Sequence, residues 1–167
     1  MSKTLPAELP PSLAQAIAAD PADAEGFTLL VIGVVDGWPH EAMIGVGEIV
    51  AVEDGVLLAL WPSSTITRAL TESGRCTVAA VVDGAAYSLR LTVERLDDIS
   101  TPLAGTLACF HGRVSGARAD EAPYAILESG IRFRLRDREP VLARWREQRA
   151  ALEARGNAAF RRRSGPG

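Results

Sequence analysis

Three consecutive hydroxyl side chains, Ser63, Ser64 and Thr65, are the residues best placed for chemistry in this sequence. They follow an apolar run and precede an apolar pair, Ile66 and Leu70, at the i,i+4 spacing of a helix. The first turn of such a helix presents unpaired backbone N–H groups and the positive end of the helix dipole. The hydroxyls can therefore either cap the helix or donate hydrogen bonds to a bound anion.

Two further side chains could extend such a site. Arg90 lies in an alternating run, on the same face as Ser88 and Thr92, where a guanidinium could bind a phosphate through two parallel hydrogen bonds. The alternative is a solvated Arg90 that pairs with Glu94. Trp61, just before the hydroxyls, could border a flat ring or simply fill the end of a strand.

The composition is typical of an ordinary globular protein, since 47% of the 167 residues are hydrophobic and 23% are charged. No apolar run approaches the length that crosses a bilayer, and the first residues lack the apolar core of a signal peptide. We therefore expect a cytoplasmic protein that does not contact a membrane. Cys76 and Cys109 stand in apolar runs, which favours buried free thiols, and the two histidines are too far apart for a zinc motif.

Charge is unevenly distributed, although the net charge is only -3. Eleven of the seventeen arginines lie beyond residue 130, together with only four acids. A basic segment can bind nucleic acid, but this one lacks interleaved aromatic side chains. Acidic side chains of the first part of the chain, or of a partner subunit, are the favoured counterparts for Arg132, Arg134 and Arg136.

Three Asp-Gly pairs, at positions 36–37, 54–55 and 83–84, predict β-hairpins, because a type I′ turn needs the positive φ that Gly adopts without strain. Gly45 and Gly47 predict a bulge, or a close approach by another segment, in one long strand. The interval between the last two pairs leaves room for a helix that starts at the hydroxyls. The predicted antiparallel strands are residues 27–35, 40–52, 56–61, 75–82, 85–96 and 103–118.

Peripheral elements flank these strands. We predict an N-terminal helical arm at 6–20, a seventh strand at 131–136, a C-terminal helix at 137–153 and a disordered tail at 157–167. A single domain would span residues 1–156, with the strands of residues 27–136 closed into a small barrel, because closure removes exposed sheet edges.

The sequence resembles the pyridoxamine 5′-phosphate oxidase-like family of FMN-binding split barrels over residues 27–118. The order of the strands and the place of the helix carry much of the resemblance. The family often has Lys two residues after the Ser of its helix motif and Asn before the Leu, where this chain has Ile66 and Ala69. The matching motifs are Gly37-Trp38-Pro39, a long second strand, a third strand ending at Trp61, the Ser64 to Leu70 pattern, and Arg75 at the start of the fourth strand.

The resemblance implies a mainly β protein, a six-stranded antiparallel Greek-key split barrel with peripheral helices. It further implies a homodimer with FMN at its interface, and an FMN-dependent oxidoreductase that acts on a small molecule by hydride transfer at flavin N5. In the family the phosphate lies near the junction of strand three and the helix, and the ring lies against strands two and three. Carried over, the cofactor-binding residues would be Met43, Ile44, Gly45, Leu60, Trp61, Ser63, Ser64, Thr65, Arg68 and Arg90.

Several alternatives stay open. A deazaflavin or haem could replace FMN in the same fold, with His111 as the candidate haem ligand. The protein could also bind or store a flavin without being an enzyme, since the sequence contains no nucleophilic triad or paired carboxylates and no catalytic residue is assigned. A barrel that binds nucleic acid or another partner through its basic C-terminus belongs to a different class.

Overall fold

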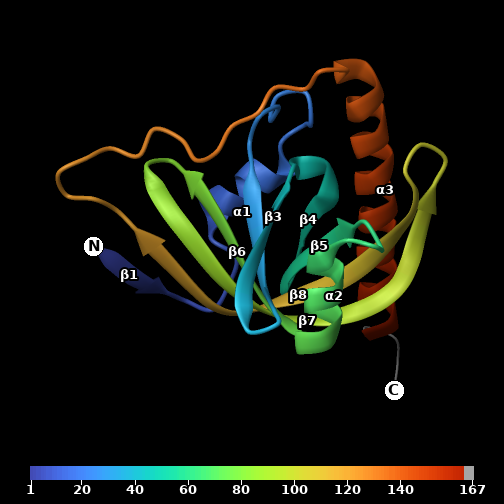
Figure 1. Ribbon diagram of the computed structural model, residues 1–167, viewed down its shortest axis with the longest axis horizontal. Helices are drawn as coiled ribbons and strands as arrows, with labels where there is room; N and C mark the ends of the chain where they lie inside the picture. The colour runs from blue at the N-terminus through green and yellow to red at the C-terminus, as the bar shows by residue number, and fades with distance from the viewer. Residues whose placement is uncertain (164–167) are drawn as a thin grey trace.

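The chain forms one curled antiparallel sheet with three α-helices around it (Figure 1). This computed structural model describes residues 1–163. The helices are α1 (Pro11–Ala18), α2 (Thr65–Ser73) and α3 (Arg138–Arg163), and a short 3-10 helix η1 spans Val46–Glu48. The strands are β1 (Ser2–Leu5), β2 (Leu29–Val35), β3 (Trp38–Ile44), β4 (Ile49–Val52), β5 (Gly55–Leu60), β6 (Arg75–Val82), β7 (Ala85–Thr101) and β8 (Gly105–Asp120).

The sheet order is β3-β2-β6-β7-β8-β5-β4, with β1 paired to β8. Strand β5 lies beside β8 rather than beside the next strand in the chain, so β5 to β8 form a Greek key. The predicted class of antiparallel Greek-key sheet with peripheral helices is confirmed. The hydrogen-bonded path is not closed into a ring, because it ends at β3 and β4, which η1 joins.

The strand count differs from the prediction for two reasons. The predicted strand 40–52 is interrupted by η1, between Gly45 and Ile49, and becomes β3 and β4. The N-terminal residues form β1, which pairs with β8 between Ser2 and Leu5. Residues 2–5 show no alternation of apolar and polar side chains from which this short strand could have been predicted.

The predicted hairpins at the three Asp-Gly pairs are present, but their turns differ. Asp36 and Gly37, like Asp83 and Gly84, have positive φ at both positions, as the type I′ turn requires. At the remaining pair Asp54 has no positive φ, and Gly55 is needed because a Cβ there would lie 2.0 Å from the carbonyl oxygen of Gly112. Close approach of two strands therefore selects this glycine.

The segment after β8 corrects one prediction. Residues 131–136 are not a strand, because Phe133 and Leu135 pack against α3 instead of a neighbouring strand, and Ile131 is 52% exposed. Phe133 contacts Trp145 edge-on, with ring centroids 6.1 Å apart, and Leu135 belongs to the same small cluster. In Figure 1 this irregular segment runs along one end of the sheet before it enters α3.

Both terminal helices have bounds other than the predicted ones. Helix α1 starts at Pro11 instead of residue 6, which agrees with the preference of Pro for the first helical turn. Helix α3 continues to Arg163, so the tail predicted as disordered is helical over 157–163, and residues 164–167 lie outside the described part of the chain. Gly156 does not end α3 but lies within it. Its lack of a side chain lets the helix approach Val52 and Leu57 closely.

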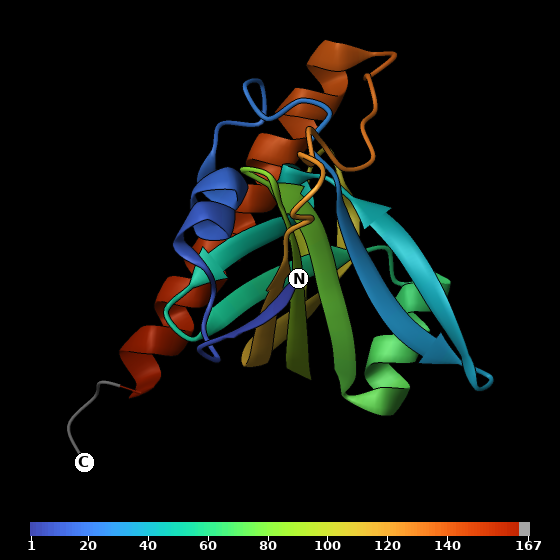
Figure 2. The same ribbon diagram turned by 90° about the vertical axis from the view of Figure 1, so that its left-hand side faces the viewer.

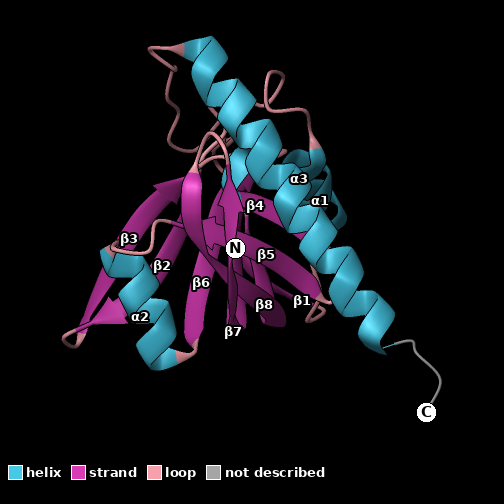
Figure 3. Ribbon diagram, turned by 90° about the vertical axis from the view of Figure 1, so that its right-hand side faces the viewer, coloured by secondary structure: helices cyan, strands magenta, loops and turns pink. Residues whose placement is uncertain are grey.

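Helices α2 and α3 lie on opposite sides of the sheet (Figures 2 and 3). The main core inside the sheet contains Leu29, Leu58 and Phe110, which are fully buried, together with the apolar side chains of α1 and α2. A second core lies between the outer face of the sheet and α3, where Leu152 packs with Leu57. The sheet therefore holds α2 and α3 in fixed positions relative to each other.

Both cysteines are buried free thiols, as predicted. Burial raises the pKa of Cys76 to about 12 and that of Cys109 to about 11. Among the residues that the structure describes, no helix is both long and apolar enough to cross a membrane.

Candidate functional site

The hydroxyls lie at the start of α2, as predicted, and they divide into two kinds. Ser64 caps the helix: its Oγ accepts a hydrogen bond from Thr67 N at 3.2 Å and donates one to Thr67 Oγ1 at 3.0 Å. Ser63 and Thr65 are exposed. One cap leaves the N–H groups of Thr65 and Ile66 without an acceptor inside the helix. The capping interpretation therefore holds for Ser64, whereas its neighbours remain able to donate to an anion.

Trp61 precedes this turn and is hydrogen-bonded to it through its backbone carbonyl group. Its carbonyl oxygen accepts hydrogen bonds from Ser64 N at 3.0 Å and from Thr67 Oγ1 at 2.8 Å. Its ring is 45% exposed, and the guanidinium of Arg144 lies over that ring, 5.7 Å from the centroid. Helix α3 thus places a cation over the ring of Trp61, which precedes the hydroxyls in the chain.

Arg144 is a residue that sequence reasoning missed. Over residues 1–158 no hydrogen bond or ion pair reaches it, and its Nε is buried without a hydrogen-bond partner. Nothing in the local sequence relates Arg144 to Trp61, because the contact depends on how α3 packs across the sheet. Its guanidinium donors are therefore available to an anion that lies beside the Trp61 ring.

Glu48 is the second residue that sequence reasoning missed. Its Oε2 accepts a hydrogen bond from Gly45 N at 2.9 Å and so stabilises the turn at η1. Burial raises the pKa of this carboxyl group, while the Gly45 N–H and the charge of Arg144 act in the opposite direction. A carboxylate next to η1 therefore influences the same arginine that covers Trp61.

The residues predicted to contact a flavin ring do not form one open surface. Ile44 and Leu60 are each 3% exposed and point into the main core. The space beside Gly45 is filled by Trp145, since a Cβ there would lie 2.6 Å from Trp145 Cη2. Met43 is 64% exposed, on the outer face of the sheet. The phosphate end of FMN fits the first turn of α2, whereas Gly45 offers no free face to the ring.

The two predicted arginines lie away from this turn. Arg68 is exposed, one turn further along α2, and its Nη2 lies 3.9 Å from Asp36 Oδ2 in the turn between β2 and β3. Arg90 is exposed on β7, between Thr77 of β6 and Gly116 of β8 in the strand register. Strand β7 is hydrogen-bonded to the C-terminal end of α2, the end opposite the hydroxyls.

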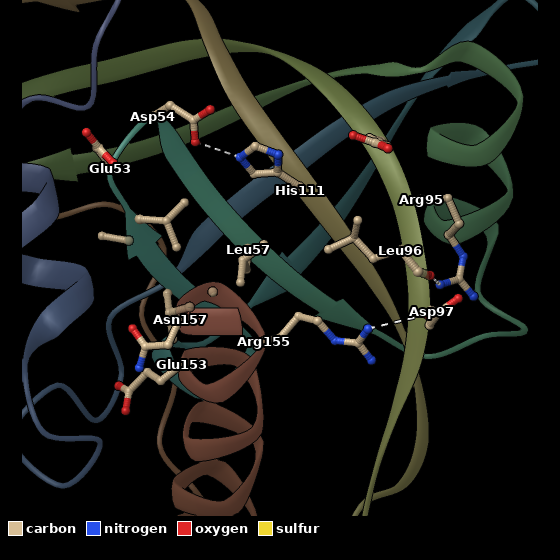
Figure 4. Close-up of a pocket in the computed structure, with 15 residues that line it drawn as sticks. Glu53, Asp54, Leu57, Arg95, Leu96, Asp97, His111, Glu153, Arg155 and Asn157 are labelled. Carbon is tan, nitrogen blue, oxygen red and sulfur yellow. Dashed lines mark hydrogen bonds and ion pairs between the residues drawn. The ribbon is translucent and has the colours of Figure 1, made fainter. Parts of the chain in front are cut away.

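A separate pocket of about 1220 Å³ lies at the other end of β5 (Figure 4). The β4–β5 hairpin, β7, β8 and the last turns of α3 form its walls. His111 lies on one side of it, with Nε2 2.8 Å from Asp54 Oδ1, and Arg113 Nε donates to Asp54 Oδ2 at 3.1 Å. The His111 side chain is only 12% exposed. Sequence reasoning singled out His111 but gave no sign of its partner on the hairpin.

The arginines of the pocket are held by protein oxygens. Arg95 donates to the carbonyl oxygens of Leu96 at 2.7 Å and Cys109 at 3.2 Å, and it pairs with Asp98. Arg155 donates to the carbonyl oxygen of Asp98 at 3.2 Å. Over the described residues there is no group of three or more His, Cys, Asp or Glu side chains that could hold a metal ion.

No family model matches the chain. The chain is 34% identical to the uncharacterized protein YclD of Bacillus subtilis over 124 residues, which are 74% of this chain and 79% of that protein. Solved structures with a similar fold include a FAD-binding protein from Mesorhizobium loti, with a TM-score of 0.48 and 11% identity over 72% of this chain and 99% of that one. A putative pyridoxamine 5′-phosphate oxidase from Listeria innocua has a TM-score of 0.45 and 11% identity, over 66% and 99% of the two chains.

Proposed function

The chain belongs to the family of YclD from Bacillus subtilis, and we propose that it is a flavin-binding protein that takes up FMN and acts as an FMN-dependent oxidoreductase. The observation that supports this most is the turn from β5 into α2, where Trp61, whose ring lies under the guanidinium of Arg144, is followed by exposed hydroxyls and free N–H groups. Deazaflavin and haem are the alternative cofactors. The proposed substrate is a small molecule, and the proposed location of the protein is the cytoplasm.

In this proposal Ser63 and Thr65 donate to the phosphate of FMN through their hydroxyls, and Thr65 and Ile66 through their N–H groups. Arg144 supplies the cation that a lysine at position 66 would otherwise provide. When bound, FMN supplies the hydride chemistry at its N5. The protein orients the cofactor and leaves Trp61 beside it.

We also propose that the protein is a homodimer that pairs through the outer face of β3, β2 and β6. Val34 and Met43 are 55% and 64% exposed there, and Met43 lies opposite Leu30 in the strand register. Leu30 and Ile32 extend this apolar surface across β2. A second copy of the chain would bury these side chains and could provide the face for the flavin ring that Gly45 does not offer.

The proposal is tested by titrating the purified chain with FMN and with riboflavin, which lacks the phosphate, while flavin fluorescence is followed. We expect FMN to bind at least about tenfold more tightly than riboflavin. Arg144→Met should remove most of this preference and leave riboflavin binding unchanged. Arg146→Met, on the exposed side of the same helix, is the matched control and should bind FMN as the natural chain does. A chain that binds neither flavin would refute the proposal.

A flavin-binding protein without enzymatic activity is the second candidate function. It needs only the anion-binding turn of Ser63 and Thr65 and no acid or base beside it. Oxidation of NADH or NADPH by the FMN-loaded protein, with an added electron acceptor, distinguishes the two. Turnover supports the oxidoreductase, whereas a bound flavin that is never reduced supports the binding protein.

A further inference from the structure

We infer that the pocket in Figure 4 binds a small ligand that carries a protonated amine on an apolar body. The pocket is separated from the first turn of α2 by the length of β5, about 20 Å for six residues. It is therefore a second site, and its ligand does not depend on the proposed flavin.

The floor of the pocket is apolar. Val50 and Leu57 are each 3% exposed, and Val52 and Leu96 are half-buried beside them. Helix α3 comes close here because Gly156 has no side chain, and a Cβ on it would lie 3.2 Å from Val52 Cγ1. An aliphatic or aromatic group placed on this floor would lose contact with water, which favours binding.

His111 offers a hydrogen-bond acceptor to the pocket. Asp54 also accepts a hydrogen bond from Arg113 Nε, and in a neutral imidazole the His111 tautomer that donates to Asp54 carries its hydrogen on Nε2. Nδ1 is then the unprotonated nitrogen, with a free lone pair. In Figure 4 the imidazole lies at the edge of the pocket, with Leu57 and Leu96 between it and Arg155.

Glu94 lies directly opposite His111 in the register of β7 and β8. Side chains of such a cross-strand pair share one face, with Cβ atoms about 5 Å apart. Glu94 lines the same pocket and is exposed. An ammonium group between them could donate to His111 Nδ1 and to the Glu94 carboxylate at once.

The remaining charges favour a cation over an anion. Arg95 and Arg155 are already held by carbonyl oxygens and by Asp98 and Asp97. In contrast, Glu53 and Glu94 have no hydrogen bond or ion pair to the side chains or backbone of residues 1–158. The unpaired charge of the pocket is therefore negative, and its apolar floor selects cations that carry a hydrocarbon group.

The test is calorimetric titration of the full chain, without flavin, with 2-phenylethylammonium as the probe. The neutral 2-phenylethanol and the anionic phenylacetate have similar apolar bodies and serve as comparison ligands. We expect the amine to bind at least about tenfold more tightly than the alcohol, and phenylacetate not to bind. Equal affinity for the amine and the alcohol, or preferential binding of phenylacetate, would overturn the inference.

Substitution of Glu94 tests the same site from the protein side. Glu94→Gln should weaken the binding of the amine by about fivefold or more and leave the binding of the alcohol unchanged. Because Glu94 is exposed, this change should not alter the melting temperature. Glu72→Gln, on the exposed face of α2, removes the same charge far from the pocket and should leave amine binding unchanged. Equal affinity of the amine for Glu94→Gln and the natural chain would exclude this carboxylate as a ligand-binding group.

Discussion

The two ends of β5 have opposite electrostatic character, although one helix supplies an arginine to each. Arg144 and Arg155 of α3 are separated by about 17 Å along the helix, close to the length of β5. At the Trp61 end the guanidinium of Arg144 lies over an aromatic ring and has no ion pair within residues 1–158, which suits an anion. At the Asp54 end Arg155 is bound by protein oxygens, whereas Glu53 and Glu94 have no hydrogen bond or ion pair to residues 1–158, which suits a cation. The character of each end depends on the local partners of the arginine.

Gly55→Ala should cause the largest loss in the free energy of unfolding, and it changes the Asp54 end of β5. The added Cβ would lie 2.0 Å from the carbonyl oxygen of Gly112, at a φ of 153° that side chains rarely adopt. Since a backbone atom cannot move aside without breaking the ladder between β5 and β8, we expect a loss of about 3 kcal/mol in the free energy of unfolding. Urea denaturation measures it. Gly116→Ala, where the nearest atom is 3.8 Å away, is the control and should cost little.

Gly47→Ala should be somewhat less severe and should act at the Trp61 end. Its Cβ would lie 2.0 Å from Cγ of Trp145, and the indole must move for the chain to fold. We expect a loss of about 2 kcal/mol and a shift of tryptophan emission to longer wavelength, because displaced Trp145 meets water. Emission that stays unchanged at full stability would show that α3 does not depend on this contact.

Ser64→Ala and Ser63→Ala separate capping from anion binding at the Trp61 end. Ser64→Ala should lower the free energy of unfolding by about 1 kcal/mol, because Thr67 N loses its acceptor. Ser63 is exposed, and no hydrogen bond reaches its side chain within residues 1–158. Ser63→Ala should therefore leave the free energy of unfolding unchanged and weaken the binding of FMN. Thermal melts and flavin titrations of both variants measure the two effects. Equal losses of stability would contradict this division of roles.

Glu48→Gln should change the free energy of unfolding least, and the size of the change should depend on pH. Burial raises the pKa of Glu48, so the folded state binds a proton more tightly than the unfolded state does. Its contribution is then most favourable below the ordinary pKa of 4.5 and is lost as pH rises through the raised value. A glutamine keeps an acceptor for Gly45 N and carries no charge. We expect it to gain less than about 1 kcal/mol at pH 7, and nothing at pH 3, in urea denaturation.

The sequence predicts those parts of the fold that local chemistry determines. Asp36-Gly37 and Asp83-Gly84 form the expected turns, and α2 is capped by Ser64 at its start and by Gly74 at its end. Alternation misleads at 131–136, because a strand and an irregular segment packed on a helix can show the same pattern. Local residues fix hairpins and helix ends, whereas the choice of packing partner is made elsewhere in the chain.

The candidate sites were less predictable, because each depends on a contact between distant residues. Arg144 reaches Trp61, and Asp54 reaches His111, only after the sheet has formed. The predicted residues Ile44 and Leu60 were assigned correctly to strands, but their side chains point inward. Strand membership follows from the apolar pattern, whereas the face that a side chain occupies in a curled sheet depends on the whole register.

The two thiols lie in different cores, so the rate at which each one is modified reports on a different opening motion of the protein. Cys76 belongs to the core inside the sheet, whereas Cys109 belongs to the core between the sheet and α3. Their burial and raised pKa values make both unreactive towards alkylating reagents while the fold is closed. The rate at which each thiol is modified therefore reports how often its own core opens, so the detachment of α3 can be timed separately from unfolding of the sheet.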